Sequence, residues 1–507
     1  MGKVFFFKSK FALLLIALVI IISCTKREKA EDSDYNRITS LARSFMYEQI
    51  VTEFITYPWD REKDPSILMV YCEALVESGK SFPSFLKSPP LPIHRSEFAQ
   101  GYYDLLRGEL QEAANRFLNL INQTINEEGQ VWGNIGFLEL ALYTEAIANM
   151  KIPLESLRSA ADRNPSSVPS WVIPYYSAWN YFNSGKFSEV DNITQKYNKE
   201  LDQITLLILQ VELLVRDNRF EEAEKAIKNL PPDLSSDQDV IALEADIINL
   251  KHGPEQWMKY LYEKHKQFPK MWLIEQRYGE ALLELGQTEL GIEILTKVAQ
   301  KRTFDVITQL YLAEDLLDYG KVAEAKEIFS HVRKKSAELP HYSTYYNFLS
   351  AKIFHMQKKE KEAQKSINLA MKLYPKAPRF LWLIFDIAME KHDYDKAAQA
   401  LKEILELYPN EVSALSSMVE LNYLRGEWDE LSIAEKKINQ SPRYISEGMR
   451  DEVKSYKAMA LAAQEKFNEA EKILAEIKET DTRARIATEI DKYRKVTKEP
   501  KRIKGDF

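Results

Sequence analysis

Residues 278–295, YGEALLELGQTELGIEIL, decide the fold class of this chain. Gly279 and Gly291 stand twelve positions apart, where two crossing helices would need to approach each other closely. Gly286 lies between them, at a place where a left-handed residue can end the first helix. Leu295 supplies an apolar side chain for a second helix. The stretch therefore predicts a short antiparallel helical hairpin.

The same pattern recurs along the chain. A mostly small residue stands in phase with Gly279 at eleven positions, and five of the ten intervals are 34 residues; these positions are Gly101, Ala141, Ala178, Val211, Ala245, Gly279, Ala313, Ala351, Phe385, Val419 and Ala458. We refer to them as the ladder. Twelve residues after it come further small residues, at Ala113, Ala223, Gly291, Ala325, Ala363, Ala397 and Ala470. Glycines follow the ladder by seven residues (Gly108, Gly185, Gly286, Gly320, Gly426) and prolines by twenty-four (Pro165, Pro269, Pro375, Pro409). Proline cannot continue a helix, so the second helix should end there.

These features together resemble the tetratricopeptide repeat, over residues 93–480 and about eleven hairpins. The resemblance implies an all-α fold, a right-handed α-solenoid in which each hairpin is stabilised by its neighbours. The composition agrees with this, because only 16 glycines occur in 507 residues and apolar residues make up 45%. We expect residues 35–92 to form degenerate helical hairpins and a proline-rich break, and residues 481–507 to form a capping helix with a basic tail.

The N-terminus has the pattern of an export signal. Three lysines precede an apolar run from Phe11 to Ile22, which is too short to span a bilayer as a stable helix. The run ends at Ile21-Ile22-Ser23-Cys24 and a charged stretch follows. This resembles the bacterial lipobox, which implies cleavage after Ser23, acylation of Cys24 by diacylglycerol and a charged tether over residues 24–34. An ordinary signal or short anchor with an incidental Cys24 is the alternative.

In the tetratricopeptide family the first helix of each hairpin lines the concave side, which indicates where a partner would bind. One residue after the ladder, six of seven residues from Glu212 to Glu420 are acidic, and aromatic residues lie within a turn of them. The candidate partner-binding residues are Tyr175, Trp179, Glu212, Asp246, Glu280, Glu314, Asp318, Tyr345, Phe348, His355, Trp382, Asp386, Glu420 and Tyr423. Such an acidic groove would favour a basic, partly apolar segment of a partner. Alternatively, the acidic residues serve only solubility, and the aromatic cluster around Trp179 forms core.

No motif of a known catalytic or metal site is present. The seven histidines include no pair four residues apart, and Gly79-Lys80-Ser81 lacks the rest of a phosphate-binding loop. Cys72 lies in an apolar run and is expected to be a buried, inert thiol. The net charge of −7 disfavours nucleic acid as a partner. We therefore expect a protein that is not an enzyme and that has no cofactor or metal.

The expected function is that of a lipid-anchored scaffold in the bacterial cell envelope, on the export side of a membrane, which recruits a protein or peptide. The alternative is a structural subunit of a machine for outer-membrane assembly, secretion or polysaccharide export. The sequence does not distinguish these two functions.

Overall fold

The computed structural model describes residues 32–59, 64–87, 91–123, 126–335 and 339–498. The predictions for residues 1–23 and Cys24 lie outside these residues, as does the end of the basic tail, 499–507. Every regular element in the described part is a helix, as the sequence predicts. No helix within these ranges is both long and apolar enough to cross a membrane.

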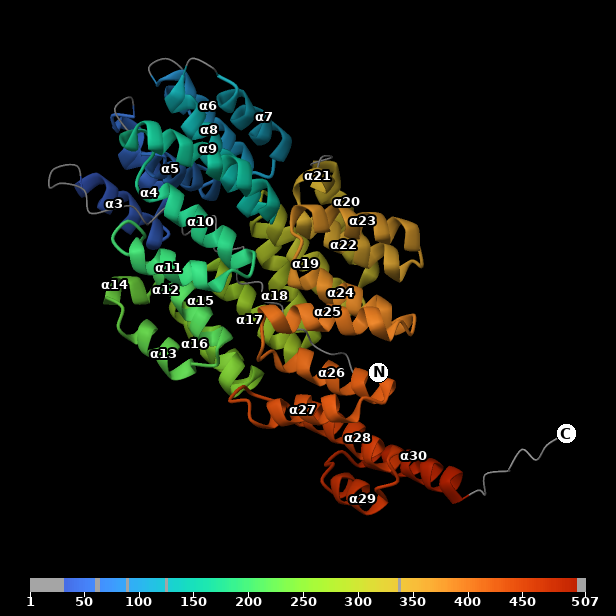
Figure 1. Ribbon diagram of the computed structural model, residues 1–507. Coiled ribbons are helices and arrows are strands. Elements are labelled where there is room, and N and C mark those ends of the chain that lie inside the picture. Colours follow the sequence, from blue (N-terminus) through green and yellow to red (C-terminus); the bar gives the residue numbers. More distant parts are fainter. Residues whose placement is uncertain (1–31, 60–63, 88–90, 124–125, 336–338, 499–507) are drawn as a thin grey trace.

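Eleven helical hairpins follow one another along the described chain (Figure 1). Their helices are α6 (Ile93–Leu106) with α7 (Leu110–Ile121), α8 (Glu127–Tyr143) with α9 (Lys151–Arg163), α10 (Val172–Asn183) with α11 (Phe187–Lys196), α12 (Gln203–Arg216) with α13 (Phe220–Lys228), α15 (Gln238–His252) with α16 (Pro254–Gln267), α17 (Trp272–Glu284) with α18 (Thr288–Lys301), α19 (Val306–Asp318) with α20 (Val322–Lys335), α22 (Thr344–Met356) with α23 (Glu360–Leu373), α24 (Pro378–Glu390) with α25 (Tyr394–Leu407), α26 (Val412–Arg425) with α27 (Trp428–Asn439), and α28 (Glu447–Ala463) with α29 (Phe467–Ala475). Single-turn helices α14 (Pro232–Ser235) and α21 (Leu339–Tyr342) lie between hairpins. The predicted right-handed α-solenoid is thus the observed fold.

The ladder residues explain why the hairpins close. Every one of them lies in the first helix of a hairpin and is buried against the second. A Cβ atom added to Gly291 would stand 2.8 Å from the carbonyl oxygen of Gly279, and one added to Gly279 would stand 2.9 Å from Cγ of Leu295. Larger side chains at this crossing would push the two helices apart.

Nine of the eleven first helices are followed by a residue with positive φ, seven positions after the ladder. All five predicted glycines have positive φ, for example 76° at Gly286 and 78° at Gly320. Four hairpins place a residue other than glycine in the same conformation, at Asn218, Lys358, His392 and Glu465. The turn geometry therefore persists even where it strains an L-residue.

Helices also cover the two ends of the array. At the N-terminal end lie α3 (Asp32–Arg43), α4 (Tyr47–Glu53) and α5 (Pro65–Glu77). At the other end, α30 (Thr480–Lys498) packs on α28 and α29 and buries Ile486 and Ile490. Apart from the hairpins, these end helices, α14 and α21, the described helical elements are 3₁₀ turns: Phe54–Thr56, Ser84–Leu86, Ile147–Met150 and Pro165–Ser167.

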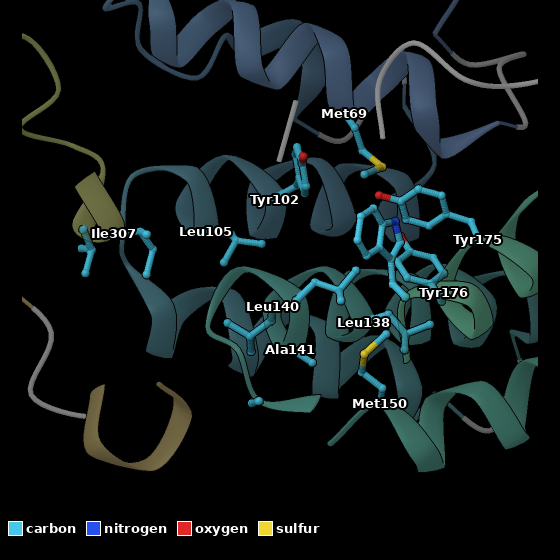
Figure 2. Close-up of a cluster of buried hydrophobic side chains, with 14 of the residues drawn as sticks. Met69, Tyr102, Leu105, Leu138, Leu140, Ala141, Met150, Tyr175, Tyr176 and Ile307 are labelled. Atoms are coloured by element: carbon cyan, nitrogen blue, oxygen red, sulfur yellow. The ribbon is translucent and has the colours of Figure 1, made fainter. Parts of the chain in front are cut away.

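The core of the N-terminal hairpins is rich in aromatic side chains. Figure 2 shows Tyr175 and Tyr176 of α10 packed between Met69 of α5 and Leu138 of α8. Tyr175 and Trp179 are each 1% exposed. The aromatic cluster therefore forms core between hairpins, which is the alternative that the sequence allowed for it.

Contacts between distant hairpins add to those between neighbours. The array curls so far that its second turn packs against its first (Figure 1). Hydrogen bonds and ion pairs join residues 162 to 234 positions apart. They connect hairpin 2 with hairpins 7, 8 and 9, hairpin 3 with the end of hairpin 8, hairpin 4 with hairpin 9 and with the connections on both sides of hairpin 10, and hairpin 5 with the connection before hairpin 11. One superhelical turn thus contains about six hairpins. We call this set of contacts the seam.

The seam satisfies carbonyl groups at the ends of first helices, which have no partner inside their own helix. The carbonyl of Thr144, after α8, accepts a hydrogen bond from the backbone N–H of Thr344 at 3.0 Å. The carbonyl of Val215 in α12 accepts one from Nη2 of Arg443 at 3.0 Å. In α15, Leu250 accepts from the backbone N–H of Tyr444 at 2.7 Å. Donors from the second turn thus replace the water that would meet these groups in an open solenoid.

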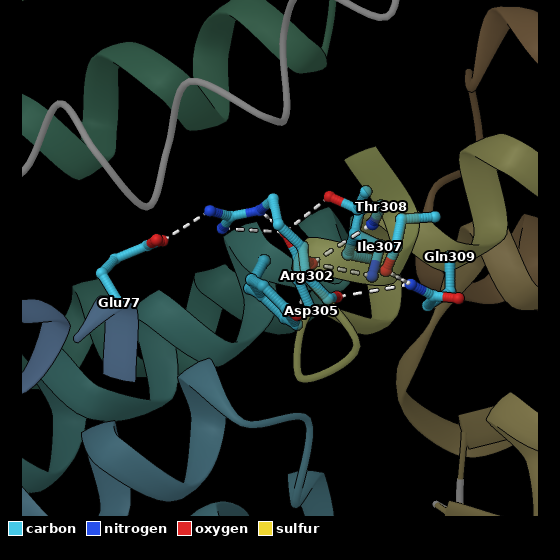
Figure 3. A network of polar contacts seen from close by, with 8 residues as sticks. Glu77, Arg302, Asp305, Ile307, Thr308 and Gln309 are labelled. Atoms are coloured by element: carbon cyan, nitrogen blue, oxygen red, sulfur yellow. Dashed lines mark hydrogen bonds and ion pairs between the residues drawn. The ribbon is translucent and has the colours of Figure 1, made fainter. Parts of the chain in front are cut away.

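A buried arginine fixes the N-terminal end of the seam. Arg302, 7% exposed, donates to Oε1 of Glu77 at 2.6 Å and to Oδ2 of Asp305 at 3.3 Å (Figure 3). Asp305 also caps α19, because Oδ1 accepts the backbone N–H groups of Ile307 and Thr308. The same Oδ1 accepts the hydroxyl of Tyr143 at 3.1 Å. One ion-pair network therefore holds α5, α8 and α19 together.

We predict that Arg302→Ala destabilises the array by about 3 kcal/mol or more, because Glu77 and Asp305 would remain buried without their cation. The variant should unfold at a lower urea concentration by circular dichroism, and small-angle scattering should show a larger radius of gyration as the seam opens.

Arg219→Ala is the matched control, because Arg219 pairs with Glu222 at a site where both side chains are more than half exposed. This variant should unfold at nearly the same urea concentration as the wild type, because ion pairs on the surface contribute little to stability. An Arg302→Ala protein as stable and as compact as this control would contradict the role given to the seam.

Candidate functional site

A central cavity of about 190 Å³ lies between the two turns of the superhelix. It is lined mainly by first helices of hairpins: α10, α12 and α15 from the first turn, and α19, α22, α24 and α26 from the second. The residues between α23 and α24, around Ala377, and those after α25, around Tyr408, complete the wall. Side chains of the two turns fill most of the lumen of the solenoid, and the cavity is the space left between them.

Charged groups in the cavity wall are unequal in number. Seven carboxylates face four cations; the carboxylates are Glu145, Glu212, Asp246, Glu314, Asp318, Asp386 and Glu411, and the cations are Arg216, Lys352, Arg379 and Arg443. Aromatic rings of Phe348, Tyr374, Trp382 and Tyr408 share the wall with aliphatic side chains. The cavity therefore combines an excess of carboxyl groups over cations with apolar surface.

Arg379 joins the two turns at the cavity. Its guanidinium donates to Oε1 of Glu145 at 2.9 Å and stacks over the ring of Tyr345 at 4.2 Å. Glu145 is 3% exposed, and burial raises the pKa of its carboxyl although Arg379 opposes the shift. The backbone of Glu145 has φ of 58°, a left-handed conformation that costs energy in a residue other than glycine.

Each of the other cations is also bound within the chain. Lys352 pairs with Asp318. Arg443 pairs with Glu411 at 3.2 Å and donates to Oδ1 of Asn218 at 2.8 Å. Arg216 donates to the carbonyl of Leu407 at 2.8 Å. These cations are thus held by the seam and by specific carboxylates.

Three carboxylates of the wall are poorly compensated. Asp246 is 7% exposed, and its nearest cation is Arg277 at 3.7 Å. Neither Glu212 nor Asp386, both half-buried, has an ion pair or hydrogen bond among the described residues. Burial raises the pKa of Asp246 to about 8 and the pKa values of Glu212 and Asp386 to about 7. Part of this site therefore becomes charged only near neutral pH.

Half of the sequence-predicted binding residues meet at this cavity. They are Glu212, Asp246, Glu314, Asp318, Phe348, Trp382 and Asp386. Two more contact residues of the wall or their partners. The hydroxyl of Tyr345 donates to Glu314, and Glu280 accepts from Nη1 of Arg277, the cation nearest to Asp246, at 2.8 Å. The periodic acidic positions of the first helices thus point into one space.

The remaining candidates lie elsewhere. Tyr175 and Trp179 belong to the core, and Nε2 of His355 pairs with Glu390 at 3.0 Å. Tyr423 contacts the hydroxyl of Tyr493 at 2.8 Å near α30, and Glu420 lies beside Tyr456. These residues do not share the cavity.

Three of the acidic candidates are buried in the structure. Asp246, Glu280 and Glu314 are 7%, 9% and 2% exposed, because the second turn covers the concave side of the first. Binding by any of the fourteen candidates stays a prediction.

Sequence analysis missed most of the cavity wall. Arg379, Arg443 and Glu145 lie in or beside the connections between helices, away from the phase that identified the acidic positions. No local signal indicates that residues as distant as Glu145 and Arg379 meet. Only the pitch of the superhelix brings them together.

Other chemistry is sparse in the described part of the chain. Within those residues, no group of three histidine, cysteine, aspartate or glutamate side chains is placed to hold a metal ion. Cys72 is fully buried, and its Sγ donates to the carbonyl of Ala99 at 3.3 Å. Burial raises the pKa of this thiol well above its usual range, which makes it unreactive.

No family model and no curated protein matches this sequence. Several solved structures resemble it at low similarity. The human IFIT1 dimer with m7Gppp-AAAA is 14% identical, with 78% of this chain and 87% of that chain covered and a TM-score of 0.41. The APC/C hetero-tetramer Cut9-Hcn1 is 13% identical over 85% and 90%, with a TM-score of 0.38. Yeast Tom70 is 13% identical over 80% and 96%, with a TM-score of 0.33. Similarity this low says nothing of what the chain binds.

We predict that the double variant Glu212→Gln, Asp246→Asn loses less stability than the wild type between pH 5 and pH 8. In the unfolded chain these carboxyls ionise near pH 4, whereas in the fold they stay protonated up to about pH 7 and 8. The unfolded state therefore binds fewer protons over this range, and stability falls as the pH rises. The variant should be more stable than the wild type at pH 8, by at least about 2 kcal/mol, and nearly equal to it close to pH 4.

Urea unfolding at a series of pH values measures this difference. Glu430→Gln, on the exposed surface of α27, is the control and should follow the wild type. If the unfolding free energy of the double variant fell with pH as steeply as that of the wild type, the two carboxyls would not be desolvated in the fold.

Proposed function

We propose that this protein is a lipid-anchored interaction scaffold on the export side of the bacterial cell envelope, and that it recruits a protein partner. The observation that supports this best is the convergence of seven first helices on one charged and aromatic cavity. A surface built from many stacked hairpins suits recognition, because each hairpin adds side chains at fixed spacing.

The anchor in this proposal is Cys24. Seven residues separate Cys24 from Asp32, where α3 begins. Even fully extended, seven residues span at most about 25 Å, so an acylated Cys24 would keep the N-terminal end of the array close to the membrane. The C-terminal end, with α28 to α30, would face away and would be free to meet other proteins.

We predict that Cys24→Ala removes the protein from the membrane fraction, because acyl chains supply the anchoring free energy at about 0.8 kcal/mol per buried methylene. Mass spectrometry of the N-terminal peptide from membranes should identify a diacylglyceryl group on Cys24. Cys72→Ala is the control and should stay in the membrane fraction with its modification. An unmodified N-terminus in membranes would contradict this part of the proposal.

A partner at the cavity is tested by crosslinking in intact cells. Trp382→Ala with Asp386→Asn should reduce the yield of a specific crosslinked protein by at least about tenfold, since aromatic residues and buried charges dominate interface energies. Glu430→Gln should leave the yield unchanged. Equal crosslinking by both variants would place any partner on another surface.

A structural subunit of an envelope machine is the second candidate function. The seam favours it, because contacts between superhelical turns make the solenoid stiff and suit it to a fixed spacer. In that case the protein should co-purify in a complex of constant stoichiometry. Free exchange between a monomer and its partner would favour the recruiting scaffold instead.

A further inference from the structure

We propose that the central cavity is a binding site for one organic cation, an alkylammonium or guanidinium group carried on a short apolar body. This goes beyond the scaffold function and does not depend on the lipid anchor. It rests on the size of the cavity, on the distribution of charge in its wall, and on the rings beside those charges.

The volume limits the ligand to a small group. A cavity of about 150 Å³ in a protein core can hold a benzene molecule. The central cavity, at about 190 Å³, is slightly larger and suits a body of benzylamine size or the end of a lysine or arginine side chain. A folded peptide segment would not fit inside it.

The charge of the wall selects a cation. The four cations of the cavity are each engaged with carboxylates or carbonyls of the chain. Asp246 is more than nine-tenths buried, accepts no hydrogen bond within the described residues and has its nearest cation only at 3.7 Å. Glu212 and Asp386 have neither an ion pair nor a hydrogen bond there. An incoming ammonium group would supply the hydrogen bonds and the positive charge that these carboxylates lack.

The three carboxylates come from both sides of the seam. Glu212 lies in α12 and Asp246 in α15, both in the first turn, whereas Asp386 lies in α24 of the second turn. A cation between them would attract helices of both turns at once. Binding should therefore stabilise the closed superhelix as well as the local site.

The apolar body has a matching surface. Trp382 and Phe348 lie in the wall with Leu250, Ile247 and Leu383. A tryptophan face attracts cations more strongly than other aromatic rings, and aliphatic side chains favour burial of methylene or ring carbons. A fully hydrated inorganic ion would make no use of this surface.

Such a cation can come from two sources, a free amine or a lysine or arginine side chain of a protein. Isothermal titration of the purified protein with benzylamine and n-pentylamine tests the free amine, and Nα-acetyl-lysine N-methylamide tests the side chain. Benzyl alcohol and pentanoate are the controls of matched size. We expect the amines to bind at least about tenfold more tightly than the alcohol, and pentanoate not to bind, because a buried charged hydrogen bond is lost in each control.

The variants Asp246→Asn and Asp386→Asn keep the shape of the side chains and should each weaken amine binding by about tenfold. Glu430→Gln should leave it unchanged. Tighter binding of the capped lysine than of the free amines would assign the cation to a protein partner and support the scaffold function. Tighter binding of the free amines would assign the cation to a free amine. The scaffold function would then be tested by the crosslinking experiment alone.

Equal binding of benzylamine and benzyl alcohol would overturn the proposal, as would unchanged amine binding by both aspartate variants. Circular dichroism of each variant shows whether it is folded. The exchange of a buried carboxylate for an amide removes a desolvated charge, so folding should be preserved.

Discussion

Carbonyl groups at the ends of the first helices need hydrogen-bond donors, and in this chain the donors come from hairpins about 200 residues further along. Thr344, Arg443 and Tyr444 donate to carbonyls that follow or end α8, α12 and α15. These bonds can form only when hairpin n stands beside hairpin n+6, so they fix the pitch of the superhelix. The pitch then determines how much of the lumen is filled. The central cavity is what remains.

Closure of the lumen also explains its electrostatics. In an open solenoid, water would solvate the acidic residues of the first helices. Their charges would then not reduce the stability of the fold. Contact between the turns removes water from Asp246, Glu280 and Glu314, and arginines offset only part of that loss. Arg277 serves both Asp246 and Glu280, while Glu212 is left without a bonded cation. The buried charges reduce the stability of the fold, and the same charges give the cavity its capacity to bind.

Local sequence predicts the hairpins well and their large-scale arrangement poorly. The ladder places every first helix correctly, because the steric demand at a helix crossing is local and appears as a small residue such as Gly279 or Ala313. Left-handed turns were recognisable only where glycine occupies them, so Lys358 and His392 gave no signal. The pitch is a sum of small rotations over six hairpins, and no single residue encodes it. For that reason the acidic half of the cavity could be predicted from its phase, whereas Arg379, Arg443 and Glu145 could not.

The cavity wall draws on residues from Glu145 to Arg443, so its parts are made at very different times during synthesis. When the first turn has left the ribosome or an export channel, Glu212 and Asp246 have no lid above them and stay hydrated. Their environment changes when hairpins 7 to 10 arrive and Arg443, in the connection after hairpin 10, reaches the end of α12. A chain that is truncated or clipped before that point would lack the enclosed space altogether. The binding site is thus a property of the finished molecule and marks its completion.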